Sequence, residues 1–425
     1  MTDTEHRRPA SPVDTANLAD NAPPAERTRR DDNAAAKPRA EFHRYPFYAP
    51  RFWHGMRPRT WWGLLRQGRF RIHPSRLPNL LGVSLATPWN TVLAWIQQLF
   101  FRKRLAKAEL HGPPVFIIGH WRSGTTLLHE LLVLDERYSS PTTFQCFAPH
   151  HFLVTEWIFQ RFFGWLLPGK RPMDNMAAGW ERPQEDEFAL MNLGLPSPYR
   201  NIAFPCEPPV DLNYLDFQDV SPTDLQRWLA ALRRFLLGVS TVTGRPLVIK
   251  SPTHTGRIAA LAKEFPDARF IHVTRDPRAL FPSTCRLWAG LAEAQGMQVA
   301  RDPSDDSTVS PTARAGDDQT LNPEKQYVVD CLRRMYDAFL RDRPGIDPNR
   351  IVDIRYEDLV ADPVAMLETI YRSLKLSDFD SVRPVIESWA ASEHRSYRTN
   401  RHQLSDQDEA TIRSAWKHYF ETYGY

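Results

Sequence analysis

The sequence predicts an α/β fold in three layers, in which helices cover both faces of a central parallel sheet. Short apolar runs rich in β-branched residues alternate along the chain with longer segments of helical periodicity. Such alternation is typical of parallel strands joined by right-handed helical crossovers. With 425 residues, 42% of them hydrophobic, the chain is long enough to bury a substantial core.

The expected elements follow one another in chain order. Residues 1–42 are rich in Ala, Pro, Arg and Asp and are predicted to be a disordered tail. An aromatic and amphipathic helical extension is expected over residues 43–112, and the main domain over residues 113–425. The predicted strands of that domain cover residues 115–118, 247–249, 269–273 and 350–354, and its predicted helices include residues 126–132, 221–237, 258–265, 327–341 and 363–374.

Aromatic side chains concentrate in the extension and again over residues 152–167. A helix is expected over residues 89–110, where Val92, Trp95 and Leu99 recur at helical spacing before a basic run. A basic amphipathic helix with Trp and Phe can lie in a bilayer interface. Packing on the main domain, or over an acceptor pocket, would use the same side chains, so both interpretations are open. No run of about 18 apolar residues predicts a membrane-spanning helix.

The residues from Val115 to Leu132 are the centre of the predicted chemistry. A buried strand leads into Gly119-x-x-x-x-Gly124, and a helix follows. This geometry directs several backbone N–H groups and a helix N-terminus at one point, where an anion can bind. The glycine spacing is that of the P-loop, but Thr125 stands where the P-loop has its Lys. The pattern therefore predicts a P-loop-like phosphate site and disfavours ATP.

The loop sequence Arg-Ser-Gly-Thr-Thr after an apolar strand resembles the 5′-phosphosulfate loop of sulfotransferases that use 3′-phosphoadenosine 5′-phosphosulfate (PAPS). The cytosolic branch usually has Lys at this arginine, whereas Golgi and many bacterial members have Arg. The chain is similar to the bacterial branch and to the tyrosylprotein-type enzymes. The resemblance implies that the 5′-phosphosulfate is bound by Arg122, Ser123, Gly124, Thr125 and Thr126.

A second motif supports this resemblance. The strand over residues 269–273 delivers Arg275 at its carboxyl end, where ligands of open α/β sheets bind, and a helix starting at Asp276-Pro277 places Ser283 about two turns further on. An Arg followed eight positions later by a Ser resembles the family's 3′-phosphate motif, in which the Arg fork grips two phosphate oxygens. A basic run over residues 394–402 stands where family members close a loop over the nucleotide, which puts Arg398 at the cofactor. That run lacks the family's Arg-Lys-Gly, and a solvated basic turn explains it equally well.

The transfer step needs a cation and a base. Lys250 follows a strand and matches the Lys-Ser-Pro of bacterial members, where it reaches the bridge between phosphate and sulfate. Cytosolic members carry a catalytic His two residues later, but Pro252 stands there. Another carboxylate or imidazole must then take the proton from the hydroxyl group of the acceptor, and we expect Glu185 to do so, with Glu187 and His254 as alternatives. The expected catalytic residues are Glu185, Lys250 and Arg122.

Composition limits the possible functions. A net charge of +4 is too small to indicate nucleic acid as a partner, and the four scattered cysteines favour a reducing cytoplasm. No metal-ligand spacing occurs, so no metal is expected. The N-terminus has no apolar core of a signal peptide, which predicts a cytoplasmic protein with possible contact to the membrane surface. The acceptor, whether small molecule, lipid or glycan, and the oligomeric state are not predicted.

We therefore expect a sulfotransferase domain over residues 113–425 that moves a sulfuryl group from PAPS to a hydroxyl or amine. Two other classes use similar folds. A P-loop kinase or NTPase is disfavoured by Thr125 in place of the P-loop Lys. A non-catalytic nucleotide-binding protein would keep the anion site and lack the transfer step.

Overall fold

The structure is a computed structural model that describes residues 46, 48–167, 179–299, 322–392 and 404–425. Its described residues contain one parallel sheet with the strand order β2–β1–β3–β4. Val115 lies opposite Val248 on one side and opposite Arg269 on the other, and Phe270 pairs with Ile351. The predicted central parallel sheet is thus confirmed. Its strands are β1 (Val115–Ile118), β2 (Val248–Lys250), β3 (Arg269–Thr274) and β4 (Ile351–Arg355).

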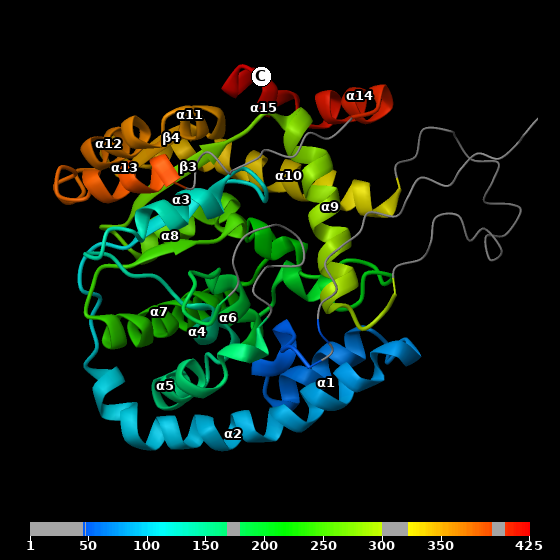
Figure 1. Ribbon diagram of the computed structural model, residues 1–425. Coiled ribbons are helices and arrows are strands. Elements are labelled where there is room, and N and C mark those ends of the chain that lie inside the picture. The colour runs from blue at the N-terminus through cyan, green and yellow to red at the C-terminus, as the bar shows by residue number, and fades with distance from the viewer. Residues whose placement is uncertain (1–45, 47, 168–178, 300–321, 393–403) are drawn as a thin grey trace, which may run out of the picture. The chain divides into compact units, whose positions relative to one another are not determined.

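The described residues also form helices, only some of which lie against the sheet (Figure 1). They are α1 (Pro58–Gln67), α2 (Leu77–Ala106), α3 (Thr125–Leu132), α4 (Thr143–Phe147), α5 (Phe152–Phe162), α6 (Asp186–Asn192), α7 (Pro222–Thr243), α8 (Ile258–Glu264), α9 (Pro277–Gln295), α10 (Pro323–Asp342), α11 (Tyr356–Ala361), α12 (Pro363–Ser373), α13 (Arg383–Ser392), α14 (Asp406–Ala415) and α15 (Lys417–Tyr423).

The alternation of side chains in β1 explains the three layers. Val115 and Ile117 belong to a core cluster with apolar side chains of α3, α12 and α13. Phe116 and Ile118 belong to a second, larger cluster with side chains of α8, α9 and α10. Successive residues of a strand point to opposite faces, so β1 supplies both cores and each core is closed by its own helices.

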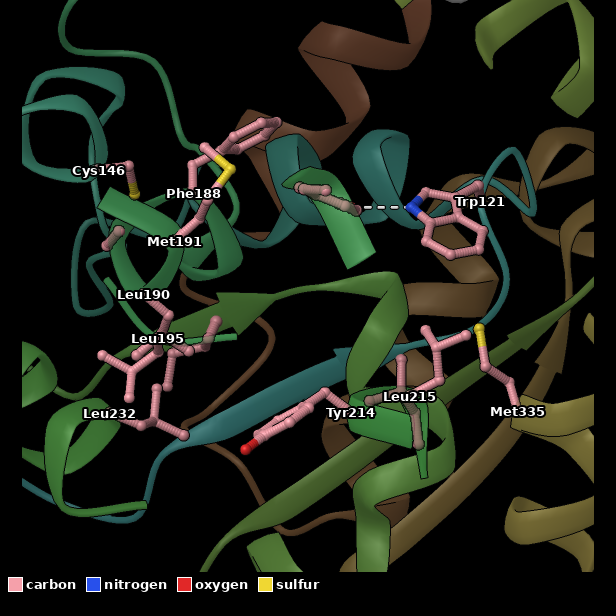
Figure 2. Close-up of a cluster of buried hydrophobic side chains, with 14 of the residues drawn as sticks. Trp121, Cys146, Phe188, Leu190, Met191, Leu195, Tyr214, Leu215, Leu232 and Met335 are labelled. Atoms are coloured by element: carbon pink, nitrogen blue, oxygen red, sulfur yellow. Dashed lines mark hydrogen bonds between the residues drawn. The ribbon is translucent and has the colours of Figure 1, made fainter. Parts of the chain in front are cut away.

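The larger core continues into the N-terminal extension. Phe52 and Trp53 of a 3-10 turn, η1 (Phe52–Gly55), Trp61 of α1 and Val83 of α2 are buried in the same cluster as Phe116. Figure 2 shows another part of this cluster, where Phe188 and other side chains of α6 meet residues from several segments. The extension is therefore packed against the main domain. The tail predicted over residues 1–42 and the C-terminal basic run lie outside the described residues.

Helix α2 differs from the prediction. We expected it to begin at residue 89, but it begins at Leu77, with Pro78 in its first turn and Pro88 inside it. Pro is tolerated in the first turn of a helix, whereas a Pro in the helix interior removes one backbone hydrogen bond. Pro88 therefore looks like the start of the helix when only the sequence is considered. Tertiary contacts keep α2 continuous through Pro88.

Most of the buried side chains that make these contacts are polar. The buried face of α2 carries Asn79, Thr87, Asn90 and Gln97 beside one apolar residue, Val83. The Asn90 amide donates to the carbonyl oxygens of His54 at 2.6 Å and Met56 at 2.8 Å. Gln97 accepts a hydrogen bond at 2.9 Å from the backbone N–H of Leu153 at the start of α5.

Replacing Asn90 tests whether polar contacts hold α2 in place. Asn90→Ala leaves two backbone carbonyls without their donor, so we expect the free energy of unfolding to fall by about 3 kcal/mol. Leu85→Ala, at an exposed position of the same helix, is expected to change it by less than about 0.5 kcal/mol. Urea denaturation followed by circular dichroism measures both. Equal effects of the two substitutions would contradict the proposed anchor.

Candidate active site

The loop between β1 and α3 has a backbone that requires its two glycines. Gly119 has φ 141° and Gly124 has φ 100°, both in the left-handed region. A Cβ at Gly119 would lie 2.4 Å from the carbonyl oxygen of Val273, and one at Gly124 would lie 2.3 Å from the Tyr356 ring. Ser123 is fully buried within this loop, and its hydroxyl has no hydrogen-bond partner among the described residues. The loop thus presents an unused hydroxyl beside the N-terminus of α3, which begins at Thr125.

The two predicted anion-binding groups adjoin each other. Arg122 of the loop donates from Nε to the hydroxyl oxygen of Ser283 in α9 at 3.0 Å. Arg275, which follows β3, donates from Nη1 to the carbonyl oxygen of Arg122 at 2.7 Å. Its guanidinium also lies 4.3 Å from the centre of the Tyr356 ring. Residues that are about 150 positions apart in the sequence therefore form one cationic cluster at the carboxyl end of the sheet.

A second cluster links Glu185 to Lys250. Glu185 is the residue before α6, Lys250 is the last residue of β2, and Lys250 Nζ lies 2.5 Å from Glu185 Oε1. The other carboxylate oxygen of Glu185 accepts a hydrogen bond from Tyr199, whose hydroxyl accepts one at 2.8 Å from the indole N–H of Trp121. Burial and the nearby charge of Glu185 raise the pKa of Tyr199 well above its usual value, so Tyr199 remains a donor. Trp121 directly precedes Arg122 in the loop.

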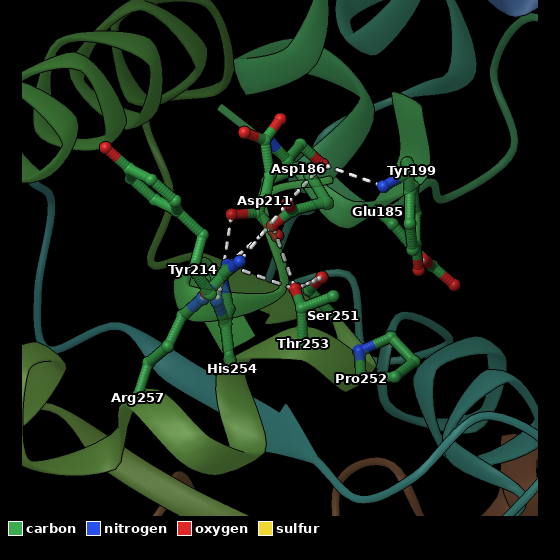
Figure 3. Close-up of polar contacts among 12 residues, drawn as sticks. Glu185, Asp186, Tyr199, Asp211, Tyr214, Ser251, Pro252, Thr253, His254 and Arg257 are labelled. Atoms are coloured by element: carbon green, nitrogen blue, oxygen red, sulfur yellow. Dashed lines mark hydrogen bonds and ion pairs between the residues drawn. The ribbon is translucent and has the colours of Figure 1, made fainter. Parts of the chain in front are cut away.

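The three consecutive carboxylates of this segment each pair with a different basic residue. Beyond the Glu185–Lys250 pair, Asp186 accepts from His254 at 2.8 Å and Glu187 from Arg257 at 2.6 Å. His254 and Arg257 belong to η6 (Pro252–Arg257), and Figure 3 shows them beside Asp186. The last two pairs are fully buried.

The electrostatics of Glu187 follow from its burial. Burial acts to raise the pKa of this carboxyl, but the charge of Arg257 and hydrogen bonds donated by Arg257 and Ser197 lower it below its usual value. Glu187 and His254, the alternative bases, are fully buried and engaged in these pairs. Glu185 retains 14% exposure of its side chain, so within the run it is the carboxylate that solvent or an acceptor can reach.

The sequence motifs predicted that Arg122, Arg275 and Ser283 would lie together, and likewise Glu185 and Lys250. Tyr199 and Arg257 were not predicted, because neither belongs to a motif with a recognisable spacing. Thr125 is buried and Thr126 is partly exposed, both in the first turn of α3. Arg398 lies outside the described residues. Within the described part of the chain, no group of three or more His, Cys, Asp or Glu side chains could hold a metal.

Comparison with known proteins gives consistent matches. The sulfotransferase family matches residues 113–381 of this chain. The omega-hydroxy-beta-dihydromenaquinone-9 sulfotransferases Stf3 of Mycobacterium bovis and Mycobacterium tuberculosis are each 38% identical over 391 residues, covering 92% of this chain and 95% of theirs.

Solved structures show the same fold. Sulfotransferase STF9 of Mycobacterium avium aligns with a TM-score of 0.59 at 20% identity, covering 86% of this chain and 92% of its own. Sulfotransferase STF1 of Mycobacterium tuberculosis aligns with a TM-score of 0.55 at 19% identity, covering 84% and 91%. The family match covers more than half of the chain, and the Stf3 relatives are similar over nearly all of it. The chain is therefore a member of the sulfotransferase family.

Proposed function

We propose that this sulfotransferase transfers a sulfuryl group from PAPS to a hydroxyl group of a lipid-like acceptor. The observation that carries the donor assignment is the contact of Arg122 with both Ser283 and Arg275. The acceptor class is suggested by the names of the Stf3 relatives, which give an omega-hydroxylated dihydromenaquinone. The family match also favours sulfuryl transfer over a kinase or NTPase activity.

The donor would be held at both of its ends. Backbone N–H groups from Ser123 to Thr126, with the hydroxyls of Thr125 and Thr126, would bind the 5′-phosphate at the N-terminus of α3. Arg275 and Ser283 would bind the 3′-phosphate, the Arg through two parallel hydrogen bonds. Ser283 and Arg122 now bind each other, so the nucleotide would replace a contact within the protein by contacts to its phosphates. Arg398 is proposed to add a cation over the nucleotide.

The transfer step would take place between Glu185 and Lys250. The acceptor oxygen forms a bond to sulfur while the bond from sulfur to the bridging oxygen of the donor breaks, and 3′-phosphoadenosine 5′-phosphate leaves. The acceptor's proton passes to the carboxylate of Glu185. Lys250 and Arg122 compensate the negative charge that develops on the leaving oxygen. Tyr199 holds the second oxygen of Glu185 and so orients this carboxylate.

The 3′-phosphate assignment is tested with Arg275→Ala. We expect the affinity for 3′-phosphoadenosine 5′-phosphate to fall by about 30-fold, because a hydrogen bond to a charged group contributes about 2 kcal/mol. The affinity for adenosine 5′-phosphosulfate, which has no 3′-phosphate, is expected to change by less than about threefold. Calorimetric titration measures both ligands. Equal losses would show that Arg275 does not contact the 3′-phosphate.

The role of Lys250 is tested by its replacement with Met, which keeps the length of the side chain. Loss of a donor used in the transition state is expected to lower kcat by about 100-fold, in line with about 3 kcal/mol. Because the substitution leaves Glu185 without its partner, stability can fall too. The double variant Lys250→Met, Glu185→Gln removes that unpaired charge and serves as the folding control. Near-normal kcat in a folded Lys250→Met protein would refute the assignment.

The base is tested with Glu185→Gln. We expect kcat to fall by about 100-fold or more, the usual contribution of a general base, with unchanged affinity for 3′-phosphoadenosine 5′-phosphate. Single-turnover sulfate transfer measures the first quantity and calorimetry the second. Retained transfer would assign the base to another residue.

Glu187→Gln is the matched comparison two residues away. This substitution removes one partner of a buried pair, so we expect a loss of about 3 kcal/mol in unfolding free energy at pH 7. Because the folded-state pKa of Glu187 is lowered, its contribution is present above the ordinary carboxyl pKa and disappears as the pH falls through the lowered one. The stability difference from the unsubstituted protein should therefore narrow in acid. Denaturation at several pH values measures this, and a constant difference would contradict the ion pair.

A further inference from the structure

The outward face of α2 carries one continuous row of large apolar side chains. These residues follow each other every three or four positions, apart from one adjacent pair at the end of the row, which places them along a single side of the helix. At 1.5 Å per residue the row extends for about 35 Å. We call this row the apolar stripe; its residues are Leu77, Leu81, Leu85, Trp89, Val92, Trp95, Leu99 and Phe100, with 44% to 78% of each exposed.

The apolar stripe is not the side by which α2 packs against the rest of the protein. The opposite face of α2 is buried against the protein through Asn90, Gln97 and other polar residues, and their hydrogen bonds fix the rotation of the helix. An ordinary surface helix buries its apolar side and exposes its polar side. Helix α2 does the reverse, so the fold holds the apolar side outward at the cost of burying amides.

The charges of α2 are of one sign. From Leu77 to Ala108 the sequence has no Asp or Glu, and the cations lie together at the C-terminal end of the helix. Arg102, Lys103 and Lys107 are exposed there. An apolar row followed by a basic cluster is complementary to an anionic phospholipid surface, where apolar side chains enter the acyl boundary and cations contact headgroups.

Neighbouring helices add further exposed aromatic side chains. Helices α1 and α5 pack beside α2 (Figure 1). Trp62 of α1 is 57% exposed and lies 5.1 Å from the Phe70 ring between ring centres. Trp157 of α5 is 64% exposed. Trp is enriched where an apolar phase meets water, because its ring is apolar and its N–H is polar.

The described helices include none that is long and apolar enough to cross a membrane. The chain's own first 41 residues contain only Met1, Val13 and Leu18 as large apolar side chains, too few to cover a row of this length. We propose that the apolar stripe docks the protein on the surface of an anionic phospholipid membrane, with α2 parallel to the bilayer and Arg102, Lys103 and Lys107 against the headgroups. This proposal needs neither the donor nor the acceptor assigned above, although a lipid-like acceptor would be met at that surface.

Vesicle flotation with the full chain tests the proposal. The probes are vesicles of phosphatidylcholine alone and vesicles with 30% phosphatidylglycerol. We expect binding to the anionic vesicles that falls at least tenfold in Trp89→Ser, Trp95→Ser. The matched control is Val242→Ser, Val385→Ser, at exposed positions of α7 and α13, which should bind as the unsubstituted protein does. The triple variant Arg102→Gln, Lys103→Gln, Lys107→Gln should lose binding to anionic vesicles about tenfold, and added salt should have the same effect.

Each outcome decides for or against the stripe. No binding to anionic vesicles, or equal binding by the stripe variant and the control variant, would overturn the proposal. A dimer that the stripe variant converts to a monomer in sedimentation, without vesicle binding, would assign the face to a second copy and overturn it too. An unchanged far-ultraviolet circular dichroism spectrum and an unchanged urea denaturation midpoint show that each variant is folded. Because no transfer is measured, failure here leaves the proposed reaction untouched, and failure of the reaction leaves this proposal untouched.

Discussion

Two ion pairs and one hydrogen bond between a histidine and a carboxylate join two short segments at the centre of this protein. Lys250, His254 and Arg257 follow one another along the end of β2 and η6, and each meets one of the three consecutive carboxylates that begin α6. A buried polar or charged group is costly unless it has a partner, so the fully buried Asp186–His254 and Glu187–Arg257 contacts favour this placement of α6 against the sheet. That placement brings Glu185 to Lys250. The chemistry proposed for Glu185 thus depends on two neighbours whose own function is structural.

The parallel sheet positions the basic residues of the candidate active site. In a parallel sheet the carboxyl ends of all strands lie at one edge, so Arg122 after β1, Lys250 at the end of β2 and Arg275 after β3 are brought near each other by topology alone. Trp121 connects the two halves, because it lies next to Arg122 in the chain and donates to Tyr199, which in turn donates to Glu185. PAPS bound at the loop and the base at the start of α6 would therefore be positioned relative to each other by these hydrogen bonds.

The sequence allowed the strands, the glycine loop and the adjacency of Arg122, Arg275 and Ser283 to be predicted, because each depends on short-range patterns and on the common direction of parallel strands. The start of α2 could not be predicted, since Pro88 looks like the start of a helix until the contacts of Asn90 and Gln97 are known. The basic partners of the carboxylates at residues 185–187 could not be predicted from the sequence either. Local sequence offers three similar carboxylates, and only the tertiary pairing decides which one stays partly exposed.

Helix α2 buries polar side chains and exposes apolar ones, so different residues determine its packing and its surface chemistry. Exposed apolar residues are common on proteins when they are scattered, but a continuous row of them marks a contact site. In α2 the amides on the inner face satisfy backbone groups of η1 and α5 and, together with Val83, position the helix without using the apolar stripe. Those side chains are then not needed for folding. Folding does not need this row, and its exposure to water is unfavourable. Its presence is explained if the helix contacts the apolar phase of a membrane, and the cations at the end of the helix indicate that the membrane surface is anionic.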